Sequence, residues 1–258
     1  MRLFKILSAI FIFSGASFLH AKDLVTDRPD ATESSSVIEP GFFQTEIGWL
    51  YTRGDNPDLK RYEIPQTLVR IGLIEGIELR LGWDGYIKED PNAGNDTSGS
   101  GDGELGVKIY GIKENAYFPK IALLSAISLP WGDAAFSSDR TDPSFRFAMS
   151  HTLSESLSLG YNLGVEWETQ DTENGRSLLS SMIYTIALGL DLTGGWGAYI
   201  ELFGDEGLSA NGSSHSFDGG LTYLIQENLQ LDALVGIGLS DSADDWFVGS
   251  GISYRFPN

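Results

Sequence analysis

The chain has 258 residues, and its 36 acidic residues outnumber its 17 basic ones, which gives a formal net charge of −19. A protein this acidic repels phosphate backbones, so nucleic acid is excluded as a partner. The sequence contains no cysteine, which excludes a disulfide framework and cysteine-ligated metal sites.

Residues 1–21 have the pattern of a secretory signal peptide. Arg2 and Lys5 form its basic start, Ile6–Leu19 is apolar, and Leu19-His20-Ala21 is a suitable cleavage site. The apolar run is too short for a membrane-spanning helix of about 20 residues, which disfavours the alternative of an N-terminal anchor. Removal of this segment changes the net charge from −19 to −21, because it contains two basic residues and no acidic one.

Residues 22–41 are polar and irregular, with the Thr26–Asp30 stretch at their centre. Two interpretations of this segment remain open. It is either a periplasmic tail or a plug inside a barrel. As a plug it would pair Arg28 with wall carboxylates, and Asp27 and Asp30 with wall arginines.

Residues 42–258 are predicted to form an all-β domain, a transmembrane antiparallel up-and-down β-barrel of about 12 strands. The chain is rich in glycine and in short apolar runs, and it lacks helical periodicity. A spacing of about 18 residues suits strands of about 10 residues plus a connection. The predicted strands begin near Phe42, Arg61, Gly76, Asp102, Pro119, Pro143, Ser156, Leu179, Gly195, His215, Asn228 and Asp245.

The connections between these strands alternate in length. The mostly long ones are 53–60, 88–101, 130–142, 168–178, 205–214 and 240–244. The mostly short ones are 74–75, 111–118, 152–155, 193–194 and 226–227. Long loops on one rim and tight turns on the other are typical of an outer-membrane barrel with both termini in the periplasm, whereas a soluble sandwich has no reason to sort its loops.

The last strand, Asp245–Phe256, shows the alternation most clearly. One face carries Trp246 near one end and Tyr254 and Phe256 near the other, with apolar residues between them. No predicted helix is available to cover this face, so we expect lipid to cover it and the aromatic residues to lie at the two membrane interfaces. The aromatic ending resembles the C-terminal signal of bacterial outer-membrane barrels. That likeness implies the barrel-assembly machinery as a partner, besides outer-membrane lipids and lipopolysaccharide.

The opposite face of the strands carries the charges. A Lys or Arg that faces lipid at the bilayer midplane costs about 2–4 kcal/mol, so these side chains must point into the lumen. There they either filter solutes, with a slight cation preference, or pair with one another and close the barrel. The number of strands does not decide between these alternatives. The predicted lumen residues are Glu46, Arg70, Glu78, Arg80, Asp84, Glu104, Lys108, Arg146, Glu166, Glu201, Asp218, Asp232 and Arg255, with Tyr86 and Tyr199 as flat faces for an aromatic solute.

Several short motifs occur in a fixed order along the chain. They include Thr26-Asp27-Arg28-Pro29-Asp30, Pro65-x-x-Leu68-x-Arg70-x-Gly72-Leu73, Glu78-Leu79-Arg80, Gly101-Asp102-Gly103, Leu129-Pro130-x-Gly132 and Asp218-x-Gly220. Together they resemble the outer-membrane transporter family named for the meta-pathway of phenol degradation. The resemblance spans Thr26 to Phe256 and implies a membrane barrel that passes small molecules, aromatic ones among them.

The sequence favours a passive channel for small solutes in the outer membrane of a Gram-negative bacterium. The alternative is a closed structural or surface-interaction barrel without transport. A lipid-modifying enzyme is a distant third, because only His151 and His215 remain after the signal peptide and neither lies in a hydrolase motif. We expect no catalytic residue, cofactor or metal site, since the acidic loops fit no EF-hand spacing.

Overall fold

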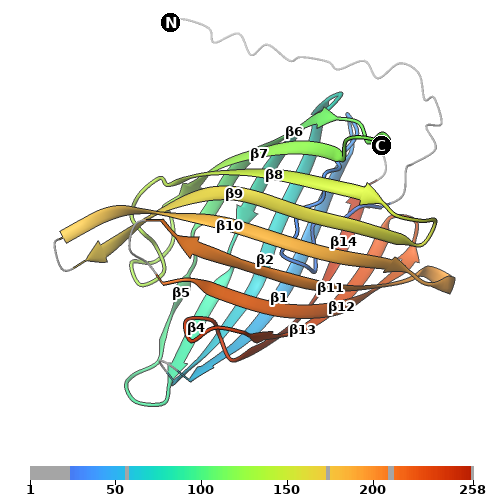
Figure 1. Ribbon diagram of the computed structural model, residues 1–258. Helices are drawn as coiled ribbons and strands as arrows, with labels where there is room; N and C mark the ends of the chain where they lie inside the picture. Colours follow the sequence, from blue (N-terminus) through green and yellow to red (C-terminus); the bar gives the residue numbers. More distant parts are fainter. Residues whose placement is uncertain (1–23, 56–57, 173–174, 209–211, 257–258) are drawn as a thin grey trace, which may run out of the picture.

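The structure is a computed structural model that describes residues 24–55, 58–172, 175–208 and 212–256. These residues form one antiparallel sheet that closes on itself (Figure 1). The predicted signal peptide at residues 1–21 lies outside the described residues. No helix in the described parts of the chain is long and apolar enough to cross a membrane.

The described residues form fourteen strands, all in this sheet, and one short 3-10 helix. Their bounds are β1 Phe43–Asp55, β2 Asp58–Ile74, β3 Ile77–Trp83, β4 Tyr86–Pro91, β5 Thr97–Ser100, β6 Gly103–Ile112, β7 Lys120–Leu129, β8 Pro143–Thr152, β9 Leu157–Thr172, β10 Gly175–Asp191, η1 Thr193–Gly195, β11 Trp196–Gly207, β12 Ser214–Gln226, β13 Leu229–Gly238 and β14 Trp246–Phe256.

Strand β1 closes the sheet because it pairs with both β2 and β14. Strands β3 and β4 pair with successive parts of β2, while β5 pairs with β4 and β6 pairs with β3. Strands β3 and β4 are therefore two halves of one spanning strand that is broken in the middle, and the same holds for β5 and β6. The structure confirms the predicted twelve-stranded antiparallel barrel.

The break between β3 and β4 changes which residues face the lumen. Gly85 has φ +87°, and a Cβ there would overlap the Pro65 carbonyl on β2. The break shifts the alternation by one residue, so Ile87 is 2% exposed and lines the interior. Tyr86 is 50% exposed and lies opposite Ile64 on the outer face, so the prediction that Tyr86 lines the lumen is wrong.

The connections at one rim are short and several at the other are long, as predicted, but some of the predicted long loops are not loops. Turns at 75–76, 113–119, 153–156, 192–195 and 227–228 share one rim with the start of β1 and the end of β14, and we call this the short-turn rim. The loops at 92–96, 130–142 and 239–245 lie at the opposite, long-loop rim. The predicted long loops 53–60, 88–101 and 168–178 are mostly strand instead, because their hairpins remain paired. The β9–β10 hairpin projects at the left of Figure 1.

Aromatic side chains form groups on the outer surface. Phe43 stacks on Phe256 at the short-turn rim, with ring centroids 4.1 Å apart. Towards the long-loop rim, Tyr51 packs against Tyr62 and Trp246 with centroid distances of 4.8 and 5.1 Å. No second layer of the described chain covers this surface. The arrangement is that of aromatic girdles on either side of an apolar band.

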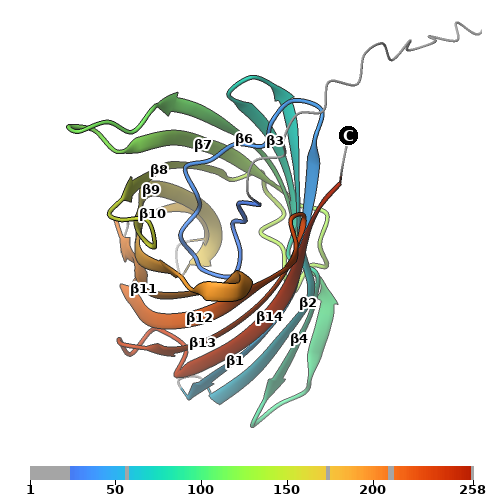
Figure 2. The same ribbon diagram turned by 90° about the vertical axis from the view of Figure 1, so that its right-hand side faces the viewer.

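The interior is filled in part by the chain itself. Residues 24–42, which we call the lumenal segment, run inside the ring of strands (blue in Figure 2). On the β11–β14 side, Tyr199, Leu234 and Phe247 form a buried apolar cluster against Leu50 and Phe203. The barrel therefore has a packed interior on this side.

Gly72 allows the lumenal segment to pass close to the wall. A Cβ at Gly72 would overlap the backbone carbonyl of Glu39, whereas one at the control position Gly111 would meet only a carbonyl at 3.5 Å. We expect Gly72→Ala to lower the free energy of unfolding by about 1–3 kcal/mol, because backbone cannot yield as a flexible side chain can. Urea unfolding in lipid vesicles measures this effect. Equal stabilities for Gly72→Ala and Gly111→Ala would contradict it.

Candidate functional site

The lumenal segment satisfies its backbone hydrogen bonds on the barrel wall. An irregular segment has no ladder partner for its N–H groups, so other acceptors must supply the bonds. The Asp27 backbone N–H donates to Glu46 at 2.9 Å, and the Ile38 N–H donates to Glu78 at 2.8 Å. On the opposite wall, Glu201 accepts from the Ala31 N–H at 2.7 Å. The predicted lumen carboxylates Glu46, Glu78 and Glu201 are thus occupied by this segment.

Asp27 lies at the centre of a buried charge network. Its carboxylate accepts from Arg80 at 2.5 Å and from Lys108 at 2.8 Å, and it lies 3.2 Å from Arg70. Burial opposes ionisation, but the positive charges of Arg70, Lys108 and Arg80 outweigh it and hold the pKa of Asp27 well below its ordinary value. Lumenal segment and wall are therefore joined by charge.

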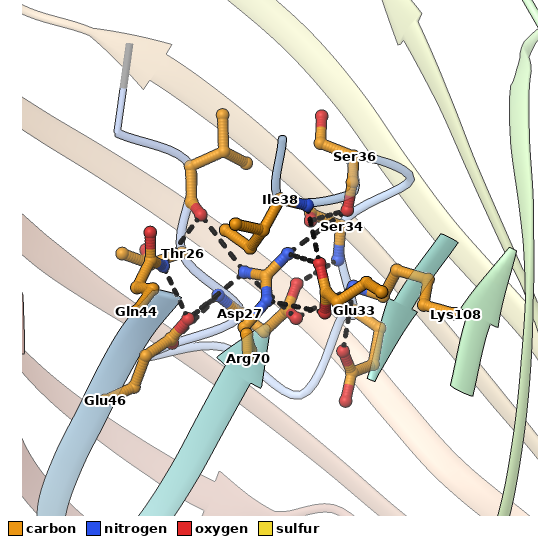
Figure 3. Close-up of polar contacts among 12 residues, drawn as sticks. Thr26, Asp27, Glu33, Ser34, Ser36, Ile38, Gln44, Glu46, Arg70 and Lys108 are labelled. Carbon is orange, nitrogen blue, oxygen red and sulfur yellow. Dashed lines mark hydrogen bonds and ion pairs between the residues drawn. The ribbon is translucent and has the colours of Figure 1, made fainter. Parts of the chain in front are cut away.

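Arg70 connects the same network to two further carboxylates of the wall. Its guanidinium donates to Glu78 at 2.8 Å and to Glu46 at 3.1 Å, and it also donates to the Ser36 carbonyl of the lumenal segment at 3.1 Å. Figure 3 shows this guanidinium surrounded by oxygens of the segment and the wall. The side chains of Arg70 and Lys108 are completely buried. Such burial is tolerable only because each cation has several acceptors.

Arg28 occupies a recess between two wall glycines. Gly48 on β1 lies opposite Gly251 on β14, and a Cβ at either position would overlap the Arg28 guanidinium. The guanidinium donates to Asp232 at 3.2 Å. The small wall residues thus admit a long cationic side chain next to a buried carboxylate.

Asp30 does not pair as the sequence suggested. Within the described residues it forms no ion pair, and the wall beside it carries Glu201 and Asp218 instead of an arginine. Burial and then the charges of these two carboxylates raise the pKa of Asp30 well above its ordinary value. The prediction that Asp30 pairs with a wall arginine is wrong, because the wall next to its carboxylate presents Glu201 and Asp218.

Two further predicted lumen residues lie away from open space. Tyr199 donates its hydroxyl to Asp218 at 3.3 Å, and its ring is packed in the apolar cluster. It offers no free face for stacking. Arg255 is buried at the short-turn rim, where its neighbour across the β1–β14 ladder is Gln44.

The remaining predicted lumen residues line an open cavity of about 680 Å³ towards the long-loop rim. Asp84, Glu104, Arg146 and Glu166 contribute to its wall. A smaller cavity of about 50 Å³ shares Glu104 and Arg146 with it, and reaches Glu33 of the lumenal segment. The lumenal segment is therefore the floor of the cavity.

Sequence reasoning missed three residues around this cavity. Arg61 pairs with Glu89 at 2.8 Å and lies 6.0 Å from the ring centroid of Phe136. A bulge opposite Trp49 shifts the alternation of β2, so a regular pattern places Arg61 on the wrong face. Phe136 belongs to the loop at 130–142, and a loop has no alternation of side chains from which its direction could be predicted. Glu33 lies in the irregular lumenal segment, which has no periodic pattern either, although its carboxylate pairs with Arg80 at 2.7 Å.

The two histidines lie on the outer face near the rims. His215 is 2.7 Å from the Tyr184 hydroxyl and 3.5 Å from Glu206, while its neighbour Ser216 is buried. His151 contacts Tyr161 at 3.2 Å. Neither histidine contacts a serine hydroxyl with its ring in the described chain. Within the same residues, no group of three or more His, Asp or Glu is placed to hold a metal ion.

A closed antiparallel barrel with an apolar, aromatic-banded exterior and a charged interior is an outer-membrane β-barrel. Its location is the outer membrane of a Gram-negative bacterium, where the outer face lies in lipid. The chain belongs to the family described as "Putative MetA-pathway of phenol degradation", whose profile matches residues 26–256. A search of curated protein sequences finds no match.

Solved structures share the fold at low sequence identity. An outer-membrane channel from Pseudomonas putida F1 is 14% identical, with a TM-score of 0.66 over 86% of this chain and 98% of that one. The NanC porin is 12% identical, with a TM-score of 0.58 over 83% and 100% of the two chains. The translocator domain of the autotransporter NalP from Neisseria meningitidis is 10% identical, with a TM-score of 0.53 over 83% and 87%. Because these proteins differ in role, the likeness defines the fold.

Proposed function

We propose that this protein is a passive channel for small solutes and not an enzyme. The observation that carries the proposal is the cavity of about 680 Å³, whose wall carries charged side chains and whose floor is the lumenal segment. Charges in a barrel must either pair or be hydrated, so a wall of this kind favours a water-filled path. We assign the short-turn rim to the periplasm and the long-loop rim to the outside.

In this proposal the lumenal segment is a plug that narrows the path. Asp27 and Arg28 fix it to walls of opposite charge, and the small cavity lies beside its Glu33. The path from outside therefore reaches its narrowest point where Glu33, Arg80 and Arg146 meet. Small solutes would pass this point, or move the segment.

The cavity wall favours cations, and two aromatic residues, Phe136 and Trp167, also line it. Six acidic residues and three arginines line it. A net acidic lining raises the local concentration of cations. The phenol pathway in the family description and the Phe136 ring in the cavity support small aromatic molecules among the solutes.

A second candidate function is a closed barrel that acts through its surface. Two observations favour it: the charge network around Asp27 and the apolar cluster around Tyr199 together fill much of the lumen. For either function we propose lipopolysaccharide as the neighbour of the long-loop rim. We also propose that the barrel-assembly machinery recognises β14.

Conductance in planar bilayers distinguishes the two functions. We expect the purified chain to give discrete openings with a cation permeability above that of anions, because the lining is acidic. Glu104→Gln with Glu166→Gln should lower the cation preference, and Glu227→Gln, an exposed residue in the turn at 227–228, serves as the control. A folded barrel that stays electrically silent would establish the closed alternative.

A further inference from the structure

Three charged side chains that line the cavity form no ion pair within 4.0 Å among the described residues. Glu104, Arg146 and Glu166 line the same cavity, and none of them is within 4.0 Å of an opposite charge among the described residues. The one polar side-chain contact of Arg146 in that part of the chain is to the Ala31 carbonyl at 3.4 Å. By contrast, the interior cations Arg70, Arg80 and Lys108 are paired with carboxylates, as Arg70 is with Glu78 at 2.8 Å. The fold therefore does not require these three charges for its own ion pairs.

The three side chains come from neighbouring parts of the wall. Glu104 lies on β6, Arg146 on β8 and Glu166 on β9, where Glu166 pairs with Ser144, two residues from Arg146 and on the same face. Glu104 and Arg146 also line the small cavity next to the lumenal segment. In the order of the sheet, Arg146 therefore lies between the two acids, with Glu104 on one side of it and Glu166 on the other. This arrangement matches a ligand with two opposite charges.

We propose that the floor of the cavity binds a zwitterion, with its carboxylate on Arg146 and its ammonium group between Glu104 and Glu166. An arginine guanidinium has the planar geometry that binds carboxylates with two hydrogen bonds, and an ammonium group donates to several carboxylates at once. The site rests on the proposed channel function, for which it names a solute class.

The size of the cavity and its aromatic lining indicate what the ligand carries besides its two charges. A cavity of about 680 Å³ is within the range of small-molecule sites. The Phe136 ring lines it and offers an apolar or stacking surface. An α-amino acid with an aromatic side chain combines both features. Because acids outnumber bases at the floor, an amine should bind better than a carboxylic acid of the same shape.

Binding to the full mature chain in detergent tests the site without any need for conduction. The probes are phenylalanine, 2-phenylethylamine, which lacks the carboxylate, and 3-phenylpropionate, which lacks the ammonium group. By titration calorimetry we expect phenylalanine to bind about tenfold more tightly than the amine, and the amine more tightly than the acid. This ranking requires no variant, so it does not depend on whether a mutant folds.

Variants assign the charges. Arg146→Gln should reduce phenylalanine to the affinity of the amine, and Glu104→Gln with Glu166→Gln should remove its advantage over the acid. Arg176→Gln is the matched control, since Arg176 lines the same cavity but lies 3.4 Å from Asp139. That variant should bind all three probes as the unmodified chain does.

The outcomes separate the site from the channel. Equal affinities for the three probes, no binding at all, or an Arg146→Gln variant that keeps the full ranking would overturn the zwitterion site. Conductance of the same preparation tests the proposed function independently. A silent barrel that binds phenylalanine overturns the channel and keeps the site, and a conducting barrel that binds no probe does the reverse.

Discussion

Asp27→Asn is expected to lower the free energy of unfolding by about 3–5 kcal/mol, the cost of removing one partner from a buried ion pair. The change leaves Arg70, Arg80 and Lys108 close together with less negative charge to offset them. Arg70 and Lys108 are completely buried, so water cannot replace the lost carboxylate without opening the network. Urea unfolding in lipid vesicles, followed by tryptophan fluorescence, gives the change.

Asp30→Asn is the matched control, because it makes the same chemical change three residues further along the segment. Asp30 faces Glu201 and Asp218, so its charge is repelled where that of Asp27 is attracted. We expect Asp30→Asn to leave the barrel equally stable or to stabilise it at neutral pH. Equal losses of stability in both variants would show that the segment responds to the loss of any carboxylate, and not to the charges around Asp27.

The two aspartates also predict opposite effects of pH. The pKa of Asp27 is lowered in the folded state, so its contribution is present above the ordinary value of 3.8 and is lost as pH falls through the lowered value. The pKa of Asp30 is raised, so the folded state holds the proton more tightly and stability falls as pH rises from 3.8 to the raised value. In Asp30→Asn this decline, at most about 1.4 kcal/mol per pH unit, should be absent.

Strand number and side-chain direction were predictable because the period of a strand is two and only one face tolerates lipid. The rule placed Glu46, Arg70 and Glu78 in the lumen, where the structure has them buried. It fails at local breaks. The Gly85 break turns Tyr86 outward, and the bulge on β2 turns Arg61 towards the lumen, which a regular alternation does not predict. A break of one residue reverses every later side chain, and no periodic pattern signals it in advance.

The partners of the lumenal segment were less predictable than its position. Opposite charges in Asp27 and Arg28 indicated pairing with the wall, and the structure places both against opposite charges. Which wall each residue meets depends on how an irregular segment turns inside the barrel. Asp30 therefore met Glu201 and Asp218 instead of an arginine. Long loops such as the one that carries Phe136 also lack a regular alternation of side chains, so their contacts cannot be predicted in this way.

Deletion of residues 22–40, with the signal peptide retained, is expected to raise single-channel conductance several-fold. The deletion removes the floor of the cavity, and the wall groups that bind the segment would then face water. Arg70 keeps its pairs with Glu78 at 2.8 Å and Glu46 at 3.1 Å, so part of the wall network survives. The apolar cluster around Tyr199 also remains, which limits the widening. Conductance that does not change would remove the plug proposal.

A disulfide lock provides the matched control for the deletion. The Ser35 hydroxyl of the segment lies 2.7 Å from the Ser150 hydroxyl of β8, and the chain has no cysteine of its own. Ser35→Cys with Ser150→Cys should therefore fix the segment to the wall under oxidation. Each single variant controls for the substitution itself. If solutes pass only when the segment moves, oxidation should abolish the openings and a reductant should restore them. If oxidised barrels conduct as the single variants do, the path runs beside a stationary segment, through the small cavity that Glu33 and Arg146 share.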